Sequence, residues 1–210
     1  MGEWAGSVRR GLIWGVLLAA LAVVGVAALR GWRGRPEAPP ILGELPVFAL
    51  VDHQGRAVGR GELAGTPWVA DLVFTRCALA CPRMTAAMAR LDRRLPPEGV
   101  RLVSVSIDPA HDTPEVLAAY AARHGASARW RFLTGEPAAV RALARDGFKL
   151  GVAEVEGEVD PGLALAHSDR FVLVDAGGRV RGYYDPFDAA ALARLERDLV
   201  ALRGETAVRP

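Results

Sequence analysis

The sequence predicts an α/β domain with a central mixed sheet flanked by helices. Apolar runs of strand length alternate along much of the chain with helical segments that open at proline, the pattern expected when helices connect neighbouring strands. The last two apolar runs are instead separated only by a turn at Gly177-Gly178, which predicts an antiparallel hairpin. The two patterns together predict a sheet with both parallel and antiparallel strands.

An uncharged apolar run covers residues 11–29, after a short segment 1–10, and has arginines on both sides. At a rise of about 1.5 Å per residue this run just spans a hydrocarbon core of about 30 Å, so it predicts a single N-terminal transmembrane helix that anchors the protein. A cleaved signal peptide is the alternative, because small residues close the run. The flanking arginines are nearly balanced, so the positive-inside rule does not decide the orientation.

Residues 30–43 are rich in glycine and proline and predict a linker, which is followed by one domain over residues 44–205. The domain is expected to begin with an N-terminal hairpin, in which residues 47–51 pair across a turn with the segment that ends at Val58.

The remaining elements follow from the apolar runs and the helix-opening prolines. In chain order we expect a strand at 68–74, a helix from 81 to about 95, a strand at 100–107, a helix at 113–124, a strand from 132, a helix at 137–146, strands at 171–174 and 180–184, and a final helix at 189–202. Glu62–Gly65 predicts a turn, and residues 148–166, with four acidic side chains, predict an exposed insertion.

The only two cysteines, Cys77 and Cys81, lie where the predicted strand 68–74 leads into a helix. Pro82 suits the first helical position, which makes Cys81 the expected helix cap, where the helix dipole and unpaired N–H groups should lower the pKa of the thiol. One helical turn between the cysteines would place their α carbons about 6 Å apart, within disulfide range. Inert core cysteines and a structural disulfide are alternatives, but the setting favours a redox-active disulfide or a site for one soft metal ion.

Four motifs in sequence order resemble the Sco/SenC family. They are Phe74–Cys77 with Cys81-Pro82, Val105–Pro109 with Asp112–Glu115, Trp130–Gly135, and His167-Ser168 before Phe171–Asp175. The resemblance extends from about Gly43 to about Leu202, and it implies a thioredoxin-like fold and copper bound by Cys77, Cys81 and His167. The family usually has Cys-Pro-Asp-x-Cys-Pro, whereas Ala78, Leu79 and Ala80 stand between the cysteines here.

The resemblance also implies a function, that of a membrane-anchored copper chaperone for assembly of the dinuclear copper centre of cytochrome c oxidase. The implied partner is the copper-accepting subunit of the oxidase, and another copper chaperone is a candidate donor. The large domain is expected outside the cytoplasm, on the periplasmic side in a bacterium. Cu(I) and Cu(II) both remain open as the ion that is carried.

The alternative function is a thiol-disulfide oxidoreductase, in which Cys77 and Cys81 reduce the cysteines of the acceptor before metallation. That role does not require His167. Nucleic acid is not an expected partner, because the net charge is only +2 and no basic block occurs. Met84 is a conceivable thioether ligand, but its spacing with Met88 and Leu91 is more typical of a helix face in the core.

Overall fold

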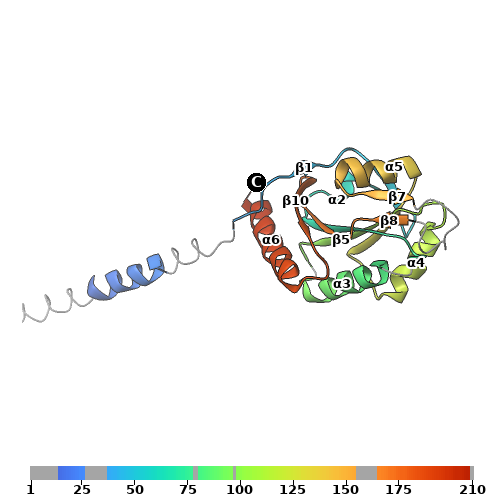
Figure 1. Ribbon diagram of the computed structural model, residues 1–210. Coiled ribbons are helices and arrows are strands. Elements are labelled where there is room, and N and C mark those ends of the chain that lie inside the picture. The colour runs from blue at the N-terminus through green and yellow to red at the C-terminus, as the bar shows by residue number, and fades with distance from the viewer. Residues whose placement is uncertain (1–13, 27–36, 78–79, 97, 155–164, 209–210) are drawn as a thin grey trace, which may run out of the picture. The chain divides into compact units, whose positions relative to one another are not determined.

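The computed structural model describes residues 14–26, 37–77, 80–96, 98–154 and 165–208 (Figure 1). The chain divides into two compact units, Met1–Glu37 and Ala38–Pro210. In the first unit, residues 14–26 form a helix with exposed side chains, and the other residues of the predicted anchor 11–29 lie outside the described residues. Within the described ranges, no helix combines the length and the apolar character needed to cross a membrane.

The second unit is built on an eight-stranded mixed sheet with the strand order β1-β10-β9-β4-β5-β6-β2-β3. Its strands are β1 (Gly43–Glu44), β2 (Ala49–Asp52), β3 (Ala57–Gly59), β4 (Trp68–Val73), β5 (Arg101–Ser106), β6 (Trp130–Thr134), β9 (Phe171–Val174) and β10 (Arg179–Tyr184). The central strands β4, β5 and β6 are parallel, and the outer strands pair antiparallel. The predicted mixed sheet and the N-terminal β2–β3 hairpin are therefore confirmed.

Helices cover both faces of this sheet (Figure 1). They are α2 (Arg60–Leu63), α3 (Ala80–Arg94), α4 (Pro114–Arg123), α5 (Pro137–Ala142) with a π-helical continuation over Leu143–Gly147, and α6 (Ala189–Val208). Apolar residues of α3, α4 and α6 pack with one face of the sheet, and those of α5 and its continuation pack with the other. Every residue of β4 is buried as a result, as expected for a central strand covered on both sides.

The position of β4 explains where the cysteines lie. β4 ends at Val73 and α3 begins at Ala80, so both cysteines follow the carboxyl end of a central parallel strand. This edge is where open α/β sheets commonly place their functional residues.

The structure differs from the predicted elements in three places. Glu62 and Leu63 belong to the short helix α2 rather than to a turn, and α6 continues well past residue 202. Part of the predicted exposed insertion 148–166 is regular, because β7 (Val152–Glu154) and β8 (Leu165–His167) form a separate two-stranded antiparallel sheet. Residues 155–164 of that insertion lie outside the described residues.

The start of the second unit is attached to the edge of the sheet. The buried side chain of Arg181 in β10 donates through Nε to the carbonyl oxygen of Pro39 at 2.7 Å, and the N–H of Leu42 donates to Val180 at 2.8 Å. The same guanidinium pairs with Asp175. Residues 39–42 thus pack on the domain. The predicted bounds of the N-terminal segment (1–10), the anchor (11–29), the linker (30–43) and the domain (44–205) stay predictions.

Candidate metal site

The two cysteines are reduced and differ in exposure. Cys77 is half-buried, whereas Cys81 is fully buried in the first turn of α3. The backbone N–H of Cys81 points at the sulfur of Cys77, with a distance of 3.4 Å between N and Sγ. The pair therefore presents one accessible sulfur and one covered sulfur, close together at the start of the helix.

His167 reaches the cysteines from the two-stranded sheet. It pairs with Val152 across β7 and β8, and the next residue, Ser168, is held by hydrogen bonds in both directions with Gly151. The imidazole is only 3% exposed and contacts the ring of Phe74 edge-on, with 6.3 Å between ring centroids. Its Nε2 atom lies 3.2 Å from the sulfur of Cys81. The structure thus brings together all three predicted site residues.

The other imidazole nitrogen determines which tautomer faces the sulfur. Nδ1 of His167 lies 3.3 Å from the carbonyl oxygen of Ser168, an acceptor, so Nδ1 carries the proton and donates it there. Burial lowers the pKa of His167, which keeps the ring neutral. Nε2 therefore directs a free lone pair at Cys81, as a metal-binding histidine requires.

The expected lowering of the Cys81 pKa by a helix-cap position is wrong. Cys81 lies inside α3 with no exposed surface, and burial raises the pKa of its thiol, which the neighbouring Cys77 raises further. Desolvation outweighs the helix dipole because a thiolate without water or a cation beside it is poorly stabilised. In the metal-free, reduced protein Cys81 is thus a neutral thiol that donates to His167 Nε2.

A buried carboxylate fixes the backbone that leads to the first cysteine. Asp112 is fully buried and accepts the N–H of Thr75 at 3.0 Å, the Thr75 hydroxyl at 2.5 Å and the Ser106 hydroxyl at 2.6 Å. Arg76, the next residue along, forms an ion pair with Asp108 at 2.5 Å. The motifs containing these two aspartates were noted in the sequence, but their role in positioning the loop was not predicted.

Asp108, His111 and Asp112 also form a compact cluster, with ligand atoms within 4.8 Å of one another. The carboxylate of Asp108 is neutralised by Arg76, and that of Asp112 is occupied by the hydrogen bonds to Thr75 and Ser106. These interactions account for the cluster as a structural network.

Two further buried side chains lie on the side of β4 that faces α3. Met84 packs fully buried in the core with Val69 and Phe132, which supports its structural interpretation. Asp71, in the middle of β4, has no exposed surface, and within the described residues neither carboxyl oxygen has a hydrogen-bond partner. Burial raises the pKa of Asp71 to about 7, and its charge contributes to the raised pKa of Cys81. Sequence reasoning missed Asp71, although an acid inside an apolar strand was a visible signal.

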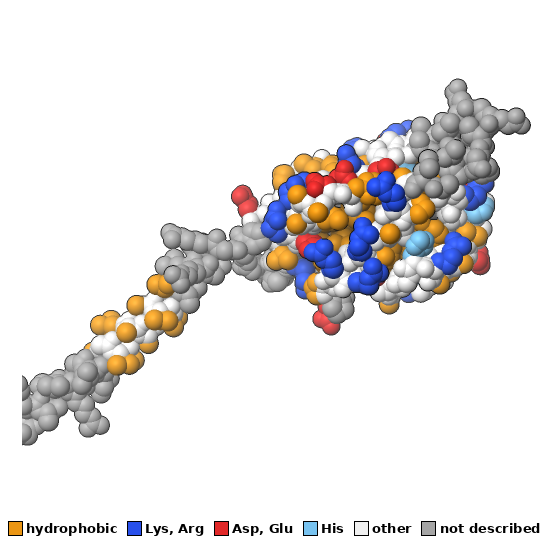
Figure 2. Space-filling view, turned by 60° about the horizontal axis from the view of Figure 1, so that its bottom comes forward, with side chains coloured by type: hydrophobic (Ala, Val, Ile, Leu, Met, Phe, Trp, Pro, Cys, Tyr) orange, Lys and Arg blue, Asp and Glu red, His pale blue; other side chains and the backbone are white. Residues whose placement is uncertain are grey.

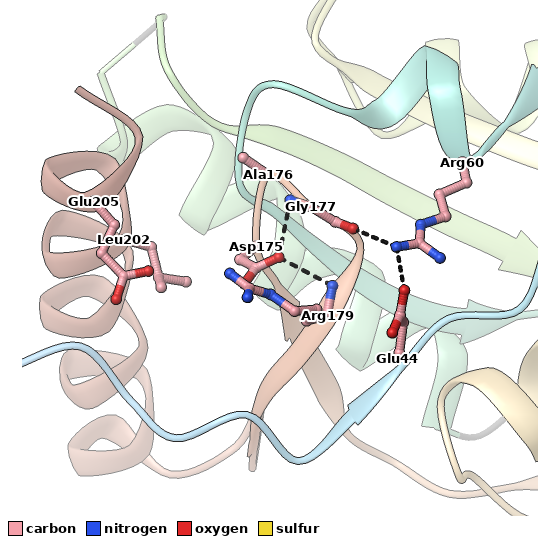
Figure 3. A pocket seen from close by; sticks show the side chains of 8 residues that line it. All are labelled: Glu44, Arg60, Asp175, Ala176, Gly177, Arg179, Leu202 and Glu205. Atoms are coloured by element: carbon pink, nitrogen blue, oxygen red, sulfur yellow. Dashed lines mark hydrogen bonds and ion pairs between the residues drawn. The ribbon is translucent and has the colours of Figure 1, made fainter. Parts of the chain in front are cut away.

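A cavity of about 520 Å³ lies away from the sulfurs (Figure 3). Asp175 lines it, directly after the β9 residue that pairs with Trp68, so the cavity is at the end of β4 opposite the cysteines. Its charged groups are all paired: Arg60 bonds to Glu44 and to the Gly177 carbonyl, Asp175 bonds to Arg179, and Glu205 bonds to Arg181. The cavity therefore offers no uncompensated charge that would compete with the candidate metal site.

Comparisons with known proteins identify a family and agree with the fold. The family model described as SCO1/SenC matches residues 42–199. A SCO1 protein homolog of Bacillus subtilis (strain 168) is 35% identical over 150 residues, which cover 70% of this chain and 76% of that relative.

Solved structures of proteins described as Sco family members have a similar fold. The crystal structure of a SCO1/SenC family lipoprotein from Bacillus anthracis has a TM-score of 0.71 at 30% identity, covering 80% of this chain and 99% of that one. BsSco, described as a member of the Sco family of cytochrome c oxidase assembly proteins with a disulfide switch, has a TM-score of 0.68 at 29% identity, covering 80% and 98%. Bradyrhizobium japonicum ScoI with copper bound shares the fold, with a TM-score of 0.63 at 23% identity over 73% and 98% of the two chains.

Proposed function

Because the chain belongs to the SCO1/SenC family, we propose that it is a membrane-anchored copper chaperone for cytochrome c oxidase. Cys77, Cys81 and His167 bind one copper ion, which the protein delivers to the copper-accepting subunit for assembly of the dinuclear copper centre. The copper-bound ScoI structure and the description of BsSco as an oxidase assembly protein support this assignment.

The observation that carries the proposal is the approach of His167 Nε2 to Cys81 Sγ at 3.2 Å, across 86 positions of the sequence. A neutral imidazole beside two sulfurs is a donor set that suits copper. The proton on the Cys81 thiol occupies the place between sulfur and nitrogen, so a copper ion that binds both atoms displaces it. Three protein ligands leave the ion open to an incoming thiolate of the acceptor, which permits transfer by ligand exchange.

The cellular location is part of the same proposal. Residues 11–29 anchor the chain in a membrane, with the copper-binding domain outside the cytoplasm, on the periplasmic side in a bacterium. The apolar run in the sequence and the description of the Bacillus anthracis relative as a lipoprotein support membrane attachment.

The test is a copper titration of the reduced, detergent-solubilised full chain. The wild type should bind one ion, Cys77→Ser and Cys81→Ser should lose nearly all binding, and His167→Ala should weaken Cu(II) more than Cu(I), since two thiolates alone hold the monovalent ion. His111→Ala is the matched control, because His111 is an exposed histidine near the site. Full stoichiometric binding by Cys77→Ser would refute the proposal.

A thiol-disulfide reductase is the second candidate, and the unequal exposure of the two reduced cysteines favours it. In that function the Cys77 thiolate attacks an acceptor disulfide and forms a mixed disulfide. Cys81 then attacks the Cys77 sulfur, which releases the acceptor as a dithiol and leaves a Cys77–Cys81 disulfide. The acceptor gains two electrons, and the cysteine pair loses two.

Complementation of cells that lack the protein separates the two functions. A delivery protein needs the imidazole, so His167→Ala should fail to restore oxidase assembly, as should both cysteine variants. A reductase needs only the cysteines. Full rescue by His167→Ala at normal protein abundance would assign the reductase function instead.

A further inference from the structure

Helix α3 carries an unbalanced row of positive charge that begins in the same helical turn as Cys81. Its exposed charged residues are all arginines: Arg83, Arg90, Arg93 and Arg94. The one acid of the helix, Asp92, is buried and paired with Arg129 at 2.7 Å. Figure 2 brings the α3 side of the domain forward and shows basic side chains gathered there, with apolar atoms between them.

Three of these arginines line a groove of about 470 Å³ between α3 and the start of α6. We call it the α3–α6 groove, and its other lining residues are Ala86, Pro186, Phe187, Ala189 and Leu192. None of the lining residues is acidic. The guanidinium of Arg83 lies over the ring of Phe187, 4.4 Å from its centroid, and Phe187 is 41% exposed. The groove thus combines cationic walls with an apolar aromatic surface.

Most of the positive charge in this groove is not neutralised by the protein. Arg94 pairs with Glu196 at 3.1 Å. Neither Arg90 nor Arg83 forms an ion pair among the residues that the structure describes, and Arg83 stacks on the ring of Phe187. Two cations therefore face solvent beside exposed apolar surface, which is an arrangement suited to an anionic ligand with apolar side chains.

We propose that the α3–α6 groove docks an acidic, partly apolar segment of the protein that accepts the copper, an inference that rests on the proposed function. The groove begins in the helical turn that contains Cys81, because Arg83 follows Cys81 by two residues, with Cys81 on the buried side of α3 and Arg83 on the exposed side. Arg90 lies about 14 Å farther along the helix axis than Cys81, at about 1.5 Å per residue. A segment held along this groove would bring its own copper ligands within reach of the ion.

A folded or extended protein segment fits the groove better than a lipid surface does. The groove is concave, and Phe187 and Leu192 provide apolar contacts that a protruding side chain can fill. An anionic bilayer presents a broad plane of charge and would interact equally with every exposed arginine of the helix. The arginines that line the groove should therefore differ in effect from Arg93, which is exposed on the same helix but does not line it.

The experiment compares Arg90→Glu with Arg93→Glu in the full chain. Both variants make the same charge change on α3, and neither residue is near the copper ligands in sequence, so copper stoichiometry and Cu(I) affinity should match the wild type. The rate of copper transfer to the soluble apo domain of the oxidase's copper-accepting subunit is measured by stopped flow. At low salt Arg90→Glu should slow transfer about 10-fold and Arg93→Glu less than about 3-fold, and salt should reduce the difference.

A second measurement does not depend on copper. A fluorescein-labelled peptide of repeated Glu-Glu-Leu should bind the apo protein in fluorescence anisotropy, and Arg90→Glu should weaken it about 10-fold relative to Arg93→Glu. If the wild type binds the peptide in this way but no copper, the proposed function fails and the acidic-segment site stands. Equal effects of the two variants in both assays, or no effect of either, would overturn the inference. The inference would also be overturned, in favour of a lipid surface, if Arg90→Glu lost binding to phosphatidylglycerol vesicles but kept the wild-type rate of copper transfer and the wild-type affinity for the peptide.

Discussion

Asp71 should make the stability of the domain depend on pH in a way that a single substitution removes. The pKa of Asp71 is raised from 3.8 to about 7, because its carboxyl group is buried in the central strand of the sheet. The nearby polar side chain of Ser104, opposite in β5, lowers this pKa only in part. The Ser104 hydroxyl accepts the indole N–H of Trp130 at 2.9 Å, and neither oxygen of Asp71 has a partner within hydrogen-bond distance in the described part of the chain.

The sign and size of the effect follow from this shift. Between pH 4 and pH 7 the folded protein holds a proton on Asp71 that the unfolded chain has lost, so the free energy of unfolding falls as the pH rises through this range. The stabilising effect of the bound proton is complete below pH 4 and absent above pH 7. A shift of about 3 pH units at about 1.4 kcal/mol each gives a loss of at most about 4 kcal/mol.

The assay is urea unfolding of the reduced protein at intervals between pH 5 and pH 8. Asp71→Asn should be more stable than the wild type at pH 8 and should lack most of the decline, because the amide does not ionise. Thr134→Val is the matched control: the Thr134 hydroxyl is also buried without a partner in the described part of the chain, but it does not titrate. The change that Thr134→Val makes in the free energy of unfolding, about 1 kcal/mol, should be the same at every pH. Parallel curves for wild type and Asp71→Asn would refute the reasoning.

Two further predictions concern the site and its support. The apparent affinity for Cu(I) should rise with pH between about pH 6 and pH 9, because copper must displace the proton from the Cys81 thiol, whose pKa is raised by burial. Competition with a chromogenic chelator measures this affinity. A pH-independent affinity would show that Cys81 is not a thiolate ligand. Asp112→Ala should destabilise the domain by about 3 kcal/mol in thermal unfolding, since it leaves the Thr75 N–H and the Ser106 hydroxyl without their acceptor. Ser127→Ala, which loses a hydrogen bond to Asp92 remote from the cysteines, should cost less, and an equal cost would mean that Asp112 has no special role.

The central architecture could be predicted because the local signals and the tertiary environment agree. The apolar run 68–74 became β4, Thr113 caps α4 by accepting the N–H of Val116, and the turn at Gly177-Gly178 joins β9 to β10. Each of these signals depends on residues close together in sequence. The three candidate ligands came from the family motifs and are adjacent in space.

The missed features depend on contacts that sequence spacing does not report. β7 and β8 are each three residues long, and they flank an acidic stretch that favours a loop, so only their pairing with each other identifies them as strands. The pKa of Cys81 was predicted in the wrong direction because the helix dipole can be inferred from the sequence, whereas the complete burial of one thiol depends on packing. The hydrogen bonds from Thr75 to Asp112 cross 37 positions and leave no local pattern.

The two-stranded sheet would give the proposed copper ion a mechanical role as well as a chemical one. The cysteines belong to the connection between β4 and α3, whereas His167 belongs to β8, which pairs only with β7 among the described strands. An ion bound as proposed, by the sulfurs and by His167, would therefore be a reversible cross-link between the main sheet and a small separate one, and it would close a loop from residue 81 to residue 167. Loading would stiffen β7 and β8 against the domain, and release would relax them. A partner that contacts this small sheet would thus sense whether the cargo is present through the rigidity of the surface.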